Sequence, residues 1–290
     1  LNSKLHLFRN LVKKNGNVIT DQSIPQFNII KNISKKKKLK LNFLSPQRKD
    51  QQIFITSHKF KGEKQLIELD YKKFKFKFSL NLIGKIQLKN ILMAIMAAEK
   101  SGINIKDIFK ILNKIKPITG RLEKIGRIYN NSKVILDYAH SPEALKIVLE
   151  NIRDQFYKKK ISIVFGCGGD RDKSKRKLMG KLSNLYCEKI YLTDDNPRNE
   201  NPKFIREEVK KGIDLKKIFE IPDRKKAIHQ AISNLKSGEI LLVAGKGHEK
   251  TQIYKNRTRF FSDKEIILKS INKKNKTISQ NLKLNIIKDI

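Results

Sequence analysis

Short apolar segments alternate with amphipathic segments from about residue 119 onward, and this alternation limits the fold more than any other feature of the chain. The apolar segments have the character of strands and are VILDYAH, ISIVFGCGG, KIYLTDDNPR, KIFEIP and EILLVAGKGHE. The segments after them have the character of helices and begin at Pro142, at Lys173, near residue 202, at Arg224 and at Asp263. Repeated strand-then-helix units predict an α/β fold whose mostly parallel sheet is covered by helices on both faces. Ligands of such sheets bind at the carboxyl ends of the strands.

The first 118 residues have a different pattern, which predicts a separate part of the chain. The helical spacing of Leu5, Phe8 and Leu11 predicts the end of a helix over 1–12. We further predict strands over 17–20, 51–57, 64–70 and 71–82, and helices over 89–100 and 106–115. The cationic stretch 31–40 is expected to be a solvated loop or an edge strand. The chain therefore divides into residues 1–118, residues 119–272 and a basic tail, 273–290, that forms a frayed helix.

The basic composition raises the question of nucleic-acid binding. The 290 residues include 65 Lys or Arg and 28 Asp or Glu, which gives a formal charge of +37. Of these cations 53 are Lys and only 12 are Arg, whereas specific nucleic-acid surfaces favour the forked Arg side chain. Phenylalanines alternate with lysines at 73–78, a pattern that can stack on single strands but is also the ordinary pattern of a half-buried strand. We attribute the charge mainly to compositional drift and do not expect nucleic acid as a partner.

Several features predict a cytoplasmic protein without a membrane partner. No run reaches the roughly 18 apolar residues that a membrane span needs. The first ten residues lack the apolar stretch of a signal peptide. The two cysteines, Cys167 and Cys187, exclude a disulfide scaffold or a four-cysteine zinc site and fit a reducing compartment.

Two polar clusters follow the first strands of the repeated pattern. In Asp137-Tyr138-Ala139-His140-Ser141-Pro142, Ser141 is a candidate helix N-cap, so the cluster is either a site or a capped turn. Gly166-Cys167-Gly168-Gly169-Asp170-Arg171-Asp172-Lys173 opens the next helix, whose N-terminus favours anions. It is not a Walker A loop, because no Gly-Lys pair of the chain is followed by Ser or Thr. Cys167 could act as a nucleophile, but a cysteine packed between glycines is more often inert.

Two more clusters follow later strands. Thr193-Asp194-Asp195-Asn196-Pro197-Arg198 offers two carboxylates and a forked cation, although its residue types also favour a plain turn. Ala244-Gly245-Lys246-Gly247-His248-Glu249 combines backbone access with a cation and a carboxylate. A ligand that carries both a carboxylate and an ammonium group would complement Arg198 and Glu249, which describes an amino acid.

These four clusters, in this order and spacing, resemble the carboxy-terminal domain of the Mur ligases. Upstream, Gly120-Arg121-Leu122-Glu123 is similar to the family's GRxE segment between the central and carboxy-terminal domains. Asn90, before Ala97-Ala98, is similar to the family's NxxNxxAA helix, with Gln87 in place of the first Asn. The resemblance covers nearly the whole chain. It implies the end of an α/β central domain over 1–118 and a Rossmann-like amino-acid-binding domain over 119–272.

The resemblance also implies an activity: ATP- and Mg²⁺-dependent addition of meso-diaminopimelate to UDP-N-acetylmuramoyl-L-alanyl-D-glutamate, in the synthesis of peptidoglycan precursors. Lys4 aligns with the lysine that the family carbamylates to help hold Mg²⁺. Arg121 and His140, with Asn90 and Asp137, would face ATP. The substrate-binding residues would be Arg171, Asp195, Asn196, Pro197, Arg198, Gly245 and Glu249. An arginine at the position of Arg198 marks the members that add diaminopimelate, which has a second carboxylate that lysine lacks.

One departure from the family is large. Its phosphate-binding loop and UDP-sugar domain should precede Lys4, and neither is in these 290 residues. We therefore expect a truncated ligase, monomeric and inactive by itself. Two alternatives stay open: a basic nucleic-acid-binding protein, and a stand-alone amino-acid-binding module.

Overall fold

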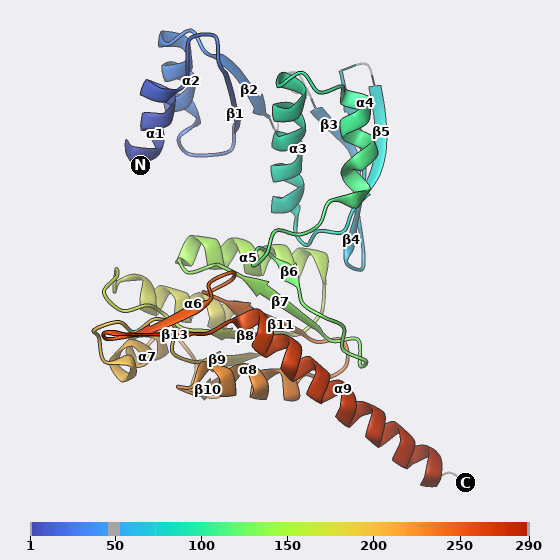
Figure 1. Ribbon diagram of the computed structural model, residues 1–290, viewed down its shortest axis with the longest axis vertical. Helices are drawn as coiled ribbons and strands as arrows, with labels where there is room; N and C mark the ends of the chain where they lie inside the picture. Colours follow the sequence, from blue (N-terminus) through green and yellow to red (C-terminus); the bar gives the residue numbers. More distant parts are fainter. Residues whose placement is uncertain (1, 46–52, 73, 289–290) are drawn as a thin grey trace. The chain divides into compact units, whose positions relative to one another are not determined.

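The chain forms two compact units, Leu1–Lys116 and Pro117–Ile290. The computed structural model describes residues 2–45, 53–72 and 74–288, with side chains described for residues 3–45, 53–72 and 74–281 (Figure 1). The unit boundary lies two residues before the predicted one. Each unit is described by itself below.

The first unit begins with two short helical segments and a small parallel sheet. The elements are α1 (Asn2–His6), a π-helical turn η1 (Leu7–Leu11), β1 (Asn17–Asp21), α2 (Phe27–Lys36) and β2 (Lys40–Leu44), with β1 and β2 parallel. The prediction of a loop or edge strand over 31–40 was wrong, because most of this stretch belongs to α2. Phe27, Ile30 and Ser34 lie three and four residues apart and are buried, which leaves the lysines of α2 on its outer face.

The rest of the first unit packs two helices against a three-stranded antiparallel sheet. The strands are β3 (Ile53–Lys61), β4 (Lys64–Tyr71) and β5 (Phe74–Leu80), and the helices are α3 (Lys85–Lys100), α4 (Ile105–Ile111) and the 3₁₀ turn Leu112–Lys114. The half-buried strand predicted from the phenylalanines is confirmed: Phe78 is buried, and Phe76 stacks on Phe109 with ring centroids 3.6 Å apart. Predicted strand residues 51, 52 and 73 lie outside the described residues. These phenylalanines serve the core of the unit.

The second unit contains the predicted mostly parallel sheet. Its strands are β6 (Glu123–Lys124), β7 (Lys133–Asp137), β8 (Ile161–Phe165), β9 (Lys189–Leu192), β10 (Ile218–Glu220) and β11 (Ile240–Ala244). They lie in the order β10-β9-β8-β11-β7-β6, and only the pair β6–β7 is antiparallel. The chain runs outward from β7 to β10 and then returns to place β11 between β7 and β8. The loops after β7, β8, β9 and β11 therefore meet at one edge of the sheet.

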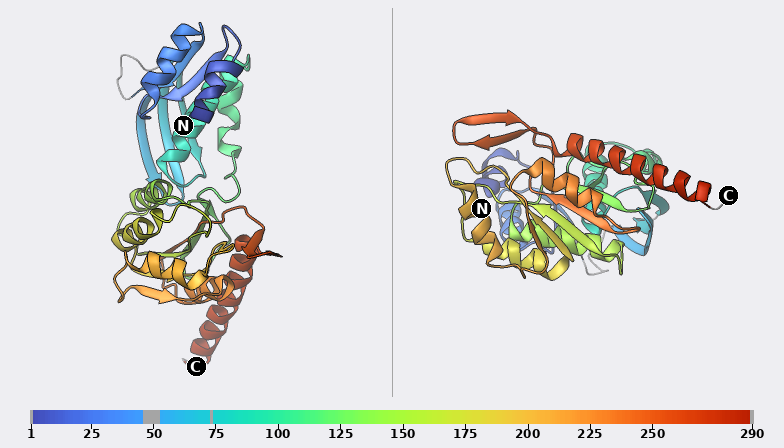
Figure 2. Two further views of the ribbon diagram at one scale, coloured as in Figure 1. Left: turned by 90° about the vertical axis from the view of Figure 1, so that its left-hand side faces the viewer. Right: turned by 90° about the horizontal axis from the view of Figure 1, so that it is seen from below.

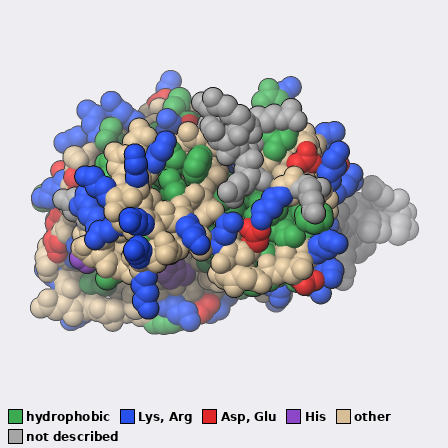
Figure 3. Space-filling view, turned by 90° about the horizontal axis from the view of Figure 1, so that it is seen from above, with side chains coloured by type: hydrophobic (Ala, Val, Ile, Leu, Met, Phe, Trp, Pro, Cys, Tyr) green, Lys and Arg blue, Asp and Glu red, His purple; other side chains and the backbone are tan. Residues whose placement is uncertain are grey.

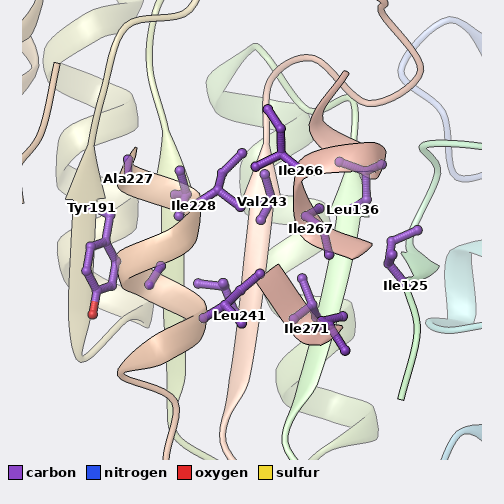
Figure 4. Packing of buried hydrophobic residues seen from close by; sticks show 14 of the residues in the cluster. Ile125, Leu136, Tyr191, Ala227, Ile228, Leu241, Val243, Ile266, Ile267 and Ile271 are labelled. Carbon is purple, nitrogen blue, oxygen red and sulfur yellow. The ribbon is translucent and has the colours of Figure 1, made fainter. Parts of the chain in front are cut away.

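Helices cover both faces of this sheet (Figure 2). The helices are α5 (Pro142–Gln155), α6 (Lys175–Tyr186), α7 (Pro202–Lys210), α8 (Arg224–Ser233) and α9 (Asp263–Lys288). On one face, α6 contacts both α5 and α7. On the other, Ile228 of α8 and Ile267 of α9 pack with Leu136 and Val243 of the sheet (Figure 4). Strands β8 and β11 are buried at every residue because both of their faces are covered.

Residues 273–288 of the predicted basic tail are part of α9, and residues 289 and 290 lie outside the described residues. The predicted boundary after residue 272 falls inside this helix, which still contacts the second unit beyond that point. The Lys274 Nζ donates hydrogen bonds to the carbonyl oxygens of Ser233 and Leu235 at 2.7 and 2.8 Å. Ile278 packs against the core of the unit. The packed part of the helix therefore extends at least to Ile278.

Basic side chains are spread over the surface. Figure 3 shows many Lys and Arg side chains among few acidic ones on one face of the molecule. None of the helices within the described ranges is long and apolar enough to cross a membrane.

Candidate amino-acid-binding site

A cavity of about 410 Å³ lies at the carboxyl edge of the sheet in the second unit. Six of the seven predicted substrate-binding residues line it, and Pro197 does not. The lining residues are Tyr138, His140, Gly166, Cys167, Gly168, Arg171, Asp172, Lys175, Asp195, Asn196, Arg198, Gly245 and Glu249. Residues up to 111 positions apart in the chain are thus brought together by the parallel sheet.

The glycine loop after β8 makes room for Arg198. The Arg198 Nη1 donates to the carbonyl oxygen of Gly169 at 2.7 Å. A Cβ at Gly168 would lie 2.9 Å from that Nη1, and a Cβ at Gly169 would lie 1.9 Å from the carbonyl oxygen of Pro197. Gly169 is therefore required for the close packing of two loops, whereas a side chain at Gly168 would displace the Arg198 guanidinium.

Glu249, Asn196 and Lys246 form a hydrogen-bonded group on another side of the cavity. The fully buried Lys246 Nζ donates to Glu249 Oε2 and to Asn196 Oδ1, both at 3.0 Å, and Asn196 Nδ2 donates to Glu249 Oε2 at 3.2 Å. Burial opposes ionisation of Glu249, but the hydrogen bond and the charge of Lys246 hold its pKa below the usual value. The site therefore presents an ionised carboxylate at neutral pH.

Asp195 adds a second acidic group. Burial raises its pKa, and the nearby charges of Arg224 and Lys246 partly offset this effect. A Cβ at Gly245, whose φ is +112°, would lie 2.7 Å from Asp195 Oδ2. Gly245 is therefore needed for backbone conformation and for the space that Asp195 occupies.

Tyr138 connects several predicted site residues, although the sequence analysis gave it no role. The Arg121 guanidinium lies over its ring, 4.6 Å from the centroid. The His140 ring packs edge-on against Tyr138 at 4.6 Å, and its Nδ1 lies 2.9 Å from the Tyr138 carbonyl oxygen. Burial raises the pKa of Tyr138, and a hydrogen bond to Glu249 adds to the effect. The role of Tyr138 could have been inferred from the position of an aromatic residue inside a polar motif at the end of a strand.

Asp137 lies beside the cavity rather than in its lining. Its two carboxylate oxygens accept hydrogen bonds from the backbone N–H groups of Leu122 and Ala139, each at 2.7 Å. Burial raises its pKa, and these hydrogen bonds oppose the rise. Asp137 thus holds the segment that follows Arg121, and its contact with the nucleotide stays a prediction.

The remaining predicted residues differ in their surroundings. Arg171 is exposed at the cavity rim. Cys167 is buried 3.7 Å from the sulfur of Met179, and burial raises the pKa of its thiol to about 12, so its interpretation as inert agrees with the structure. Lys4 on α1 and Asn90 on α3 are exposed residues of the first unit, and their roles stay predictions. The described residues include no group of three His, Cys, Asp or Glu that could hold a metal ion.

Glu200 fastens the loop that carries Arg171. Its carboxylate accepts hydrogen bonds from the buried Arg176 at 2.8 and 2.9 Å and from the backbone N–H of Asp170. The Arg176 hydrogen bonds, with the charges of Arg176 and Lys173, lower the pKa of Glu200 to about 2. The carboxylate therefore stabilises the native state as an anion.

This arrangement predicts a pH-dependent effect of Glu200→Gln. Because the native pKa lies below the unfolded value, the stabilisation is present above about pH 4.5 and is lost as the pH falls toward 2. We expect the substitution to lower the free energy of unfolding by about 2 kcal/mol at pH 7 and by roughly half of that or less at pH 3. Urea unfolding at the two pH values measures this, and an equal loss at both would contradict it.

Known proteins match both units. The protein-family model described as "Mur ligase middle domain" matches residues 1–98. The family model described as "Mur ligase, glutamate ligase domain" matches residues 120–247. The UDP-N-acetylmuramoyl-L-alanyl-D-glutamate–2,6-diaminopimelate ligase of Rickettsia montanensis is 37% identical over 271 residues, which are 93% of this chain and 55% of that protein. The protein of the same name from Buchnera aphidicola subsp. Baizongia pistaciae is 46% identical over 195 residues, 67% of this chain and 38% of its own length.

Solved structures agree. A structure of a UDP-N-acetylmuramoyl-L-alanyl-D-glutamate–2,6-diaminopimelate ligase has a TM-score of 0.63 and 27% identity, with coverage of 93% of this chain and 55% of that one. MurF ligase from Thermotoga maritima in complex with ADP has a TM-score of 0.66 and 17% identity, with coverage of 95% of this chain and 57% of that one. At this identity the similarity shows the fold alone. The chain spans about half the length of the curated relatives it matches.

The fold and the family matches define an α/β protein with a ligase middle domain followed by a glutamate ligase domain. More specifically, the chain belongs to the Mur ligase family.

Proposed function

We propose that this chain is the diaminopimelate-binding part of a ligase that adds meso-diaminopimelate to UDP-N-acetylmuramoyl-L-alanyl-D-glutamate. The main support is one cavity whose lining includes Arg198 together with the acidic residues Asp195 and Glu249. Meso-diaminopimelate carries two carboxylates and two ammonium groups, so it complements both signs of charge. Lysine has one carboxylate only and would leave one cation of the site unpaired.

In the proposed reaction, ATP activates the glutamate carboxylate. A carboxylate oxygen attacks the γ-phosphorus and ADP leaves, which gives an acyl phosphate. The diaminopimelate amine then attacks the acyl carbon, phosphate leaves, and the nitrogen loses a proton. In this chain, Arg198 and Glu249 would orient the amino acid, and charge neutralisation and positioning would supply most of the rate.

The resemblance to the family supplies the proposed nucleotide contacts. The Arg121 guanidinium on the Tyr138 ring, with His140 beside it, suits an anionic nucleotide at the cavity wall. Asn90 would contact the nucleotide from α3. Asp137 would position Arg121 through its hydrogen bond to Leu122. Mg²⁺ would compensate phosphate charge, held in part by Lys4 as a carbamate. We further propose a cytoplasmic monomer, in keeping with the buried, free Cys167 and Cys187.

Calorimetric titration of the 290-residue chain tests the proposed site. We expect meso-diaminopimelate to bind at least about tenfold more tightly than L-lysine, because a charge-assisted hydrogen bond contributes about 1.5–3 kcal/mol. We expect no ATP-dependent phosphate release from this chain alone, since none of its Gly-Lys pairs precedes Ser or Thr. Equal affinity for the two amino acids, or tighter binding to DNA than to either, would contradict the proposal.

A further inference from the structure

A hairpin that the sequence analysis did not predict lies against the loop that carries Arg198. It consists of β12 (Thr251–Tyr254) and β13 (Arg257–Phe260), paired from Thr251 with Phe260 to Tyr254 with Arg257. It projects from the second unit in orange-red in Figure 2. The residues of β13 are exposed, and an isolated two-stranded hairpin is at most marginally stable. Contacts with its surroundings must therefore hold it in place.

Those contacts go to the backbone and side chains of Asp194–Arg198. The Gln252 Nε2 donates to the carbonyl oxygens of Asp195 at 2.7 Å and Asp194 at 3.3 Å. The backbone N–H of Ile253 donates to Asn196 Oδ1 at 3.1 Å. The hairpin thus holds the loop at three consecutive residues.

Arg198 itself is held at both of its backbone groups. Its N–H donates to the carbonyl oxygen of Ile253 at 3.1 Å, and its carbonyl oxygen accepts from the N–H of Lys255 at 2.6 Å. Arg198 has a φ of +52°, a left-handed conformation that costs a non-glycine residue roughly 1–2 kcal/mol. The two hydrogen bonds offset this cost. They also set the direction in which the side chain leaves the backbone toward the cavity.

Gln252 is the buried centre of this arrangement. Its side chain is fully buried, and its Oε1 accepts from Arg259 Nη2 at 2.7 Å and from Nε at 3.2 Å. Because the guanidinium can only donate, it directs the amide oxygen outward and the NH₂ group toward the Asp194 and Asp195 carbonyl oxygens. Arg259 therefore orients the amide, and the amide holds the loop.

We propose that the β12–β13 hairpin, through Gln252, is a specificity-determining element that positions Arg198 for the distal carboxylate of the amino-acid substrate. Gln252 is a positioning residue, since it lies behind the loop and outside the cavity lining. The inference rests on the proposed function, in which the cavity binds meso-diaminopimelate.

Three variants test this proposal in the 290-residue chain. Gln252→Glu keeps the size of the side chain and its contact with Arg259, but it replaces the NH₂ donor with an oxygen that can only accept. Gln252→Met removes both the hydrogen bonds to the loop carbonyls and those from Arg259. Arg259→Met leaves Gln252 in place and frees its amide. Arg257→Met is the matched control, because it removes the same group from an exposed position of the same strand.

The measurement is the ratio of the dissociation constants for L-lysine and meso-diaminopimelate, obtained by calorimetry, alongside the unfolding midpoint. We expect both Gln252 variants and Arg259→Met to lower this ratio about tenfold through weaker diaminopimelate binding, as for the loss of one or two hydrogen bonds. Lysine affinity and the ratio for Arg257→Met should not change. A merely structural role would lower the unfolding midpoint and weaken both amino acids alike.

The outcomes separate the two proposals. If the unsubstituted chain does not prefer diaminopimelate, the proposed function is overturned and this inference with it. If it does prefer diaminopimelate, and the folded Arg259→Met and Gln252 variants keep the full ratio, only the role of the hairpin is overturned. A Gln252 variant that does not fold leaves Arg259→Met and its control to decide.

Discussion

Replacing Asp263 with alanine is expected to lower the free energy of unfolding of the second unit by about 3–5 kcal/mol, as for breaking a buried ion pair. Asp263 accepts two hydrogen bonds from Arg224, at 2.8 and 2.7 Å, and both side chains are fully buried. Arg224 also donates to the carbonyl oxygen of Ala244 at 2.9 Å, at the end of β11. Without Asp263, the guanidinium keeps its charge in a buried place and loses its counter-ion.

Urea unfolding followed by near-ultraviolet circular dichroism of tyrosine measures this effect. Six of the seven tyrosines lie in the second unit, so the signal reports chiefly on it. The control is Lys146→Ala, which removes an exposed pair with Glu150 and should cost no more than about 0.5 kcal/mol. The double variant Arg224→Met, Asp263→Leu should recover most of the loss, because it removes the buried guanidinium together with its counter-ion. An unchanged midpoint for Asp263→Ala would contradict the prediction.

Arg198→Met is expected to weaken meso-diaminopimelate binding about 10- to 100-fold, the range for losing hydrogen bonds to a charged group. Lysine has no distal carboxylate, so its affinity should change little. Methionine keeps a flexible side chain of similar length but can neither donate to Gly169 nor pair with an anion. Calorimetry with both amino acids measures the change.

Two further variants sharpen the interpretation. Arg198→Lys should retain part of the affinity, because an ammonium keeps the charge but not the forked geometry. Arg257→Met removes an exposed guanidinium from the same unit and should leave both affinities unchanged. A parallel loss of lysine affinity in Arg198→Met would show that the residue does not read the second carboxylate.

The parallel sheet of the second unit was predictable because its signal is local. Strands β7, β8, β9 and β11 are short runs of mostly buried apolar residues, and several helices begin after a capping residue, such as Ser141 before Pro142. The four polar clusters could be assigned to strand ends for the same reason. Helix α2 was missed because its lysines dominate the composition of 31–40, whereas its buried face depends on only three residues.

The β12–β13 hairpin and β6 could not be predicted in the same way. Both are short, and the hairpin residues are largely exposed, so neither has a strong apolar alternation. Hydrogen bonds to distant loops hold the hairpin, and no local pattern encodes them. Gln252 lies 57 positions from Asp195 in the chain but 2.7 Å from its carbonyl oxygen.

The sequence by itself determined the α/β class, the place of the polar clusters at strand ends, and the residue types that suit an amino acid. Only the tertiary structure decided which of these residues meet in one cavity. It placed Lys246 behind Glu249, turned Asp137 toward the backbone of Leu122, and set Gln252 behind Arg198. The physical reason is that burial and hydrogen-bond partners depend on segments that are distant in the chain, and these determine the charge and direction of each side chain.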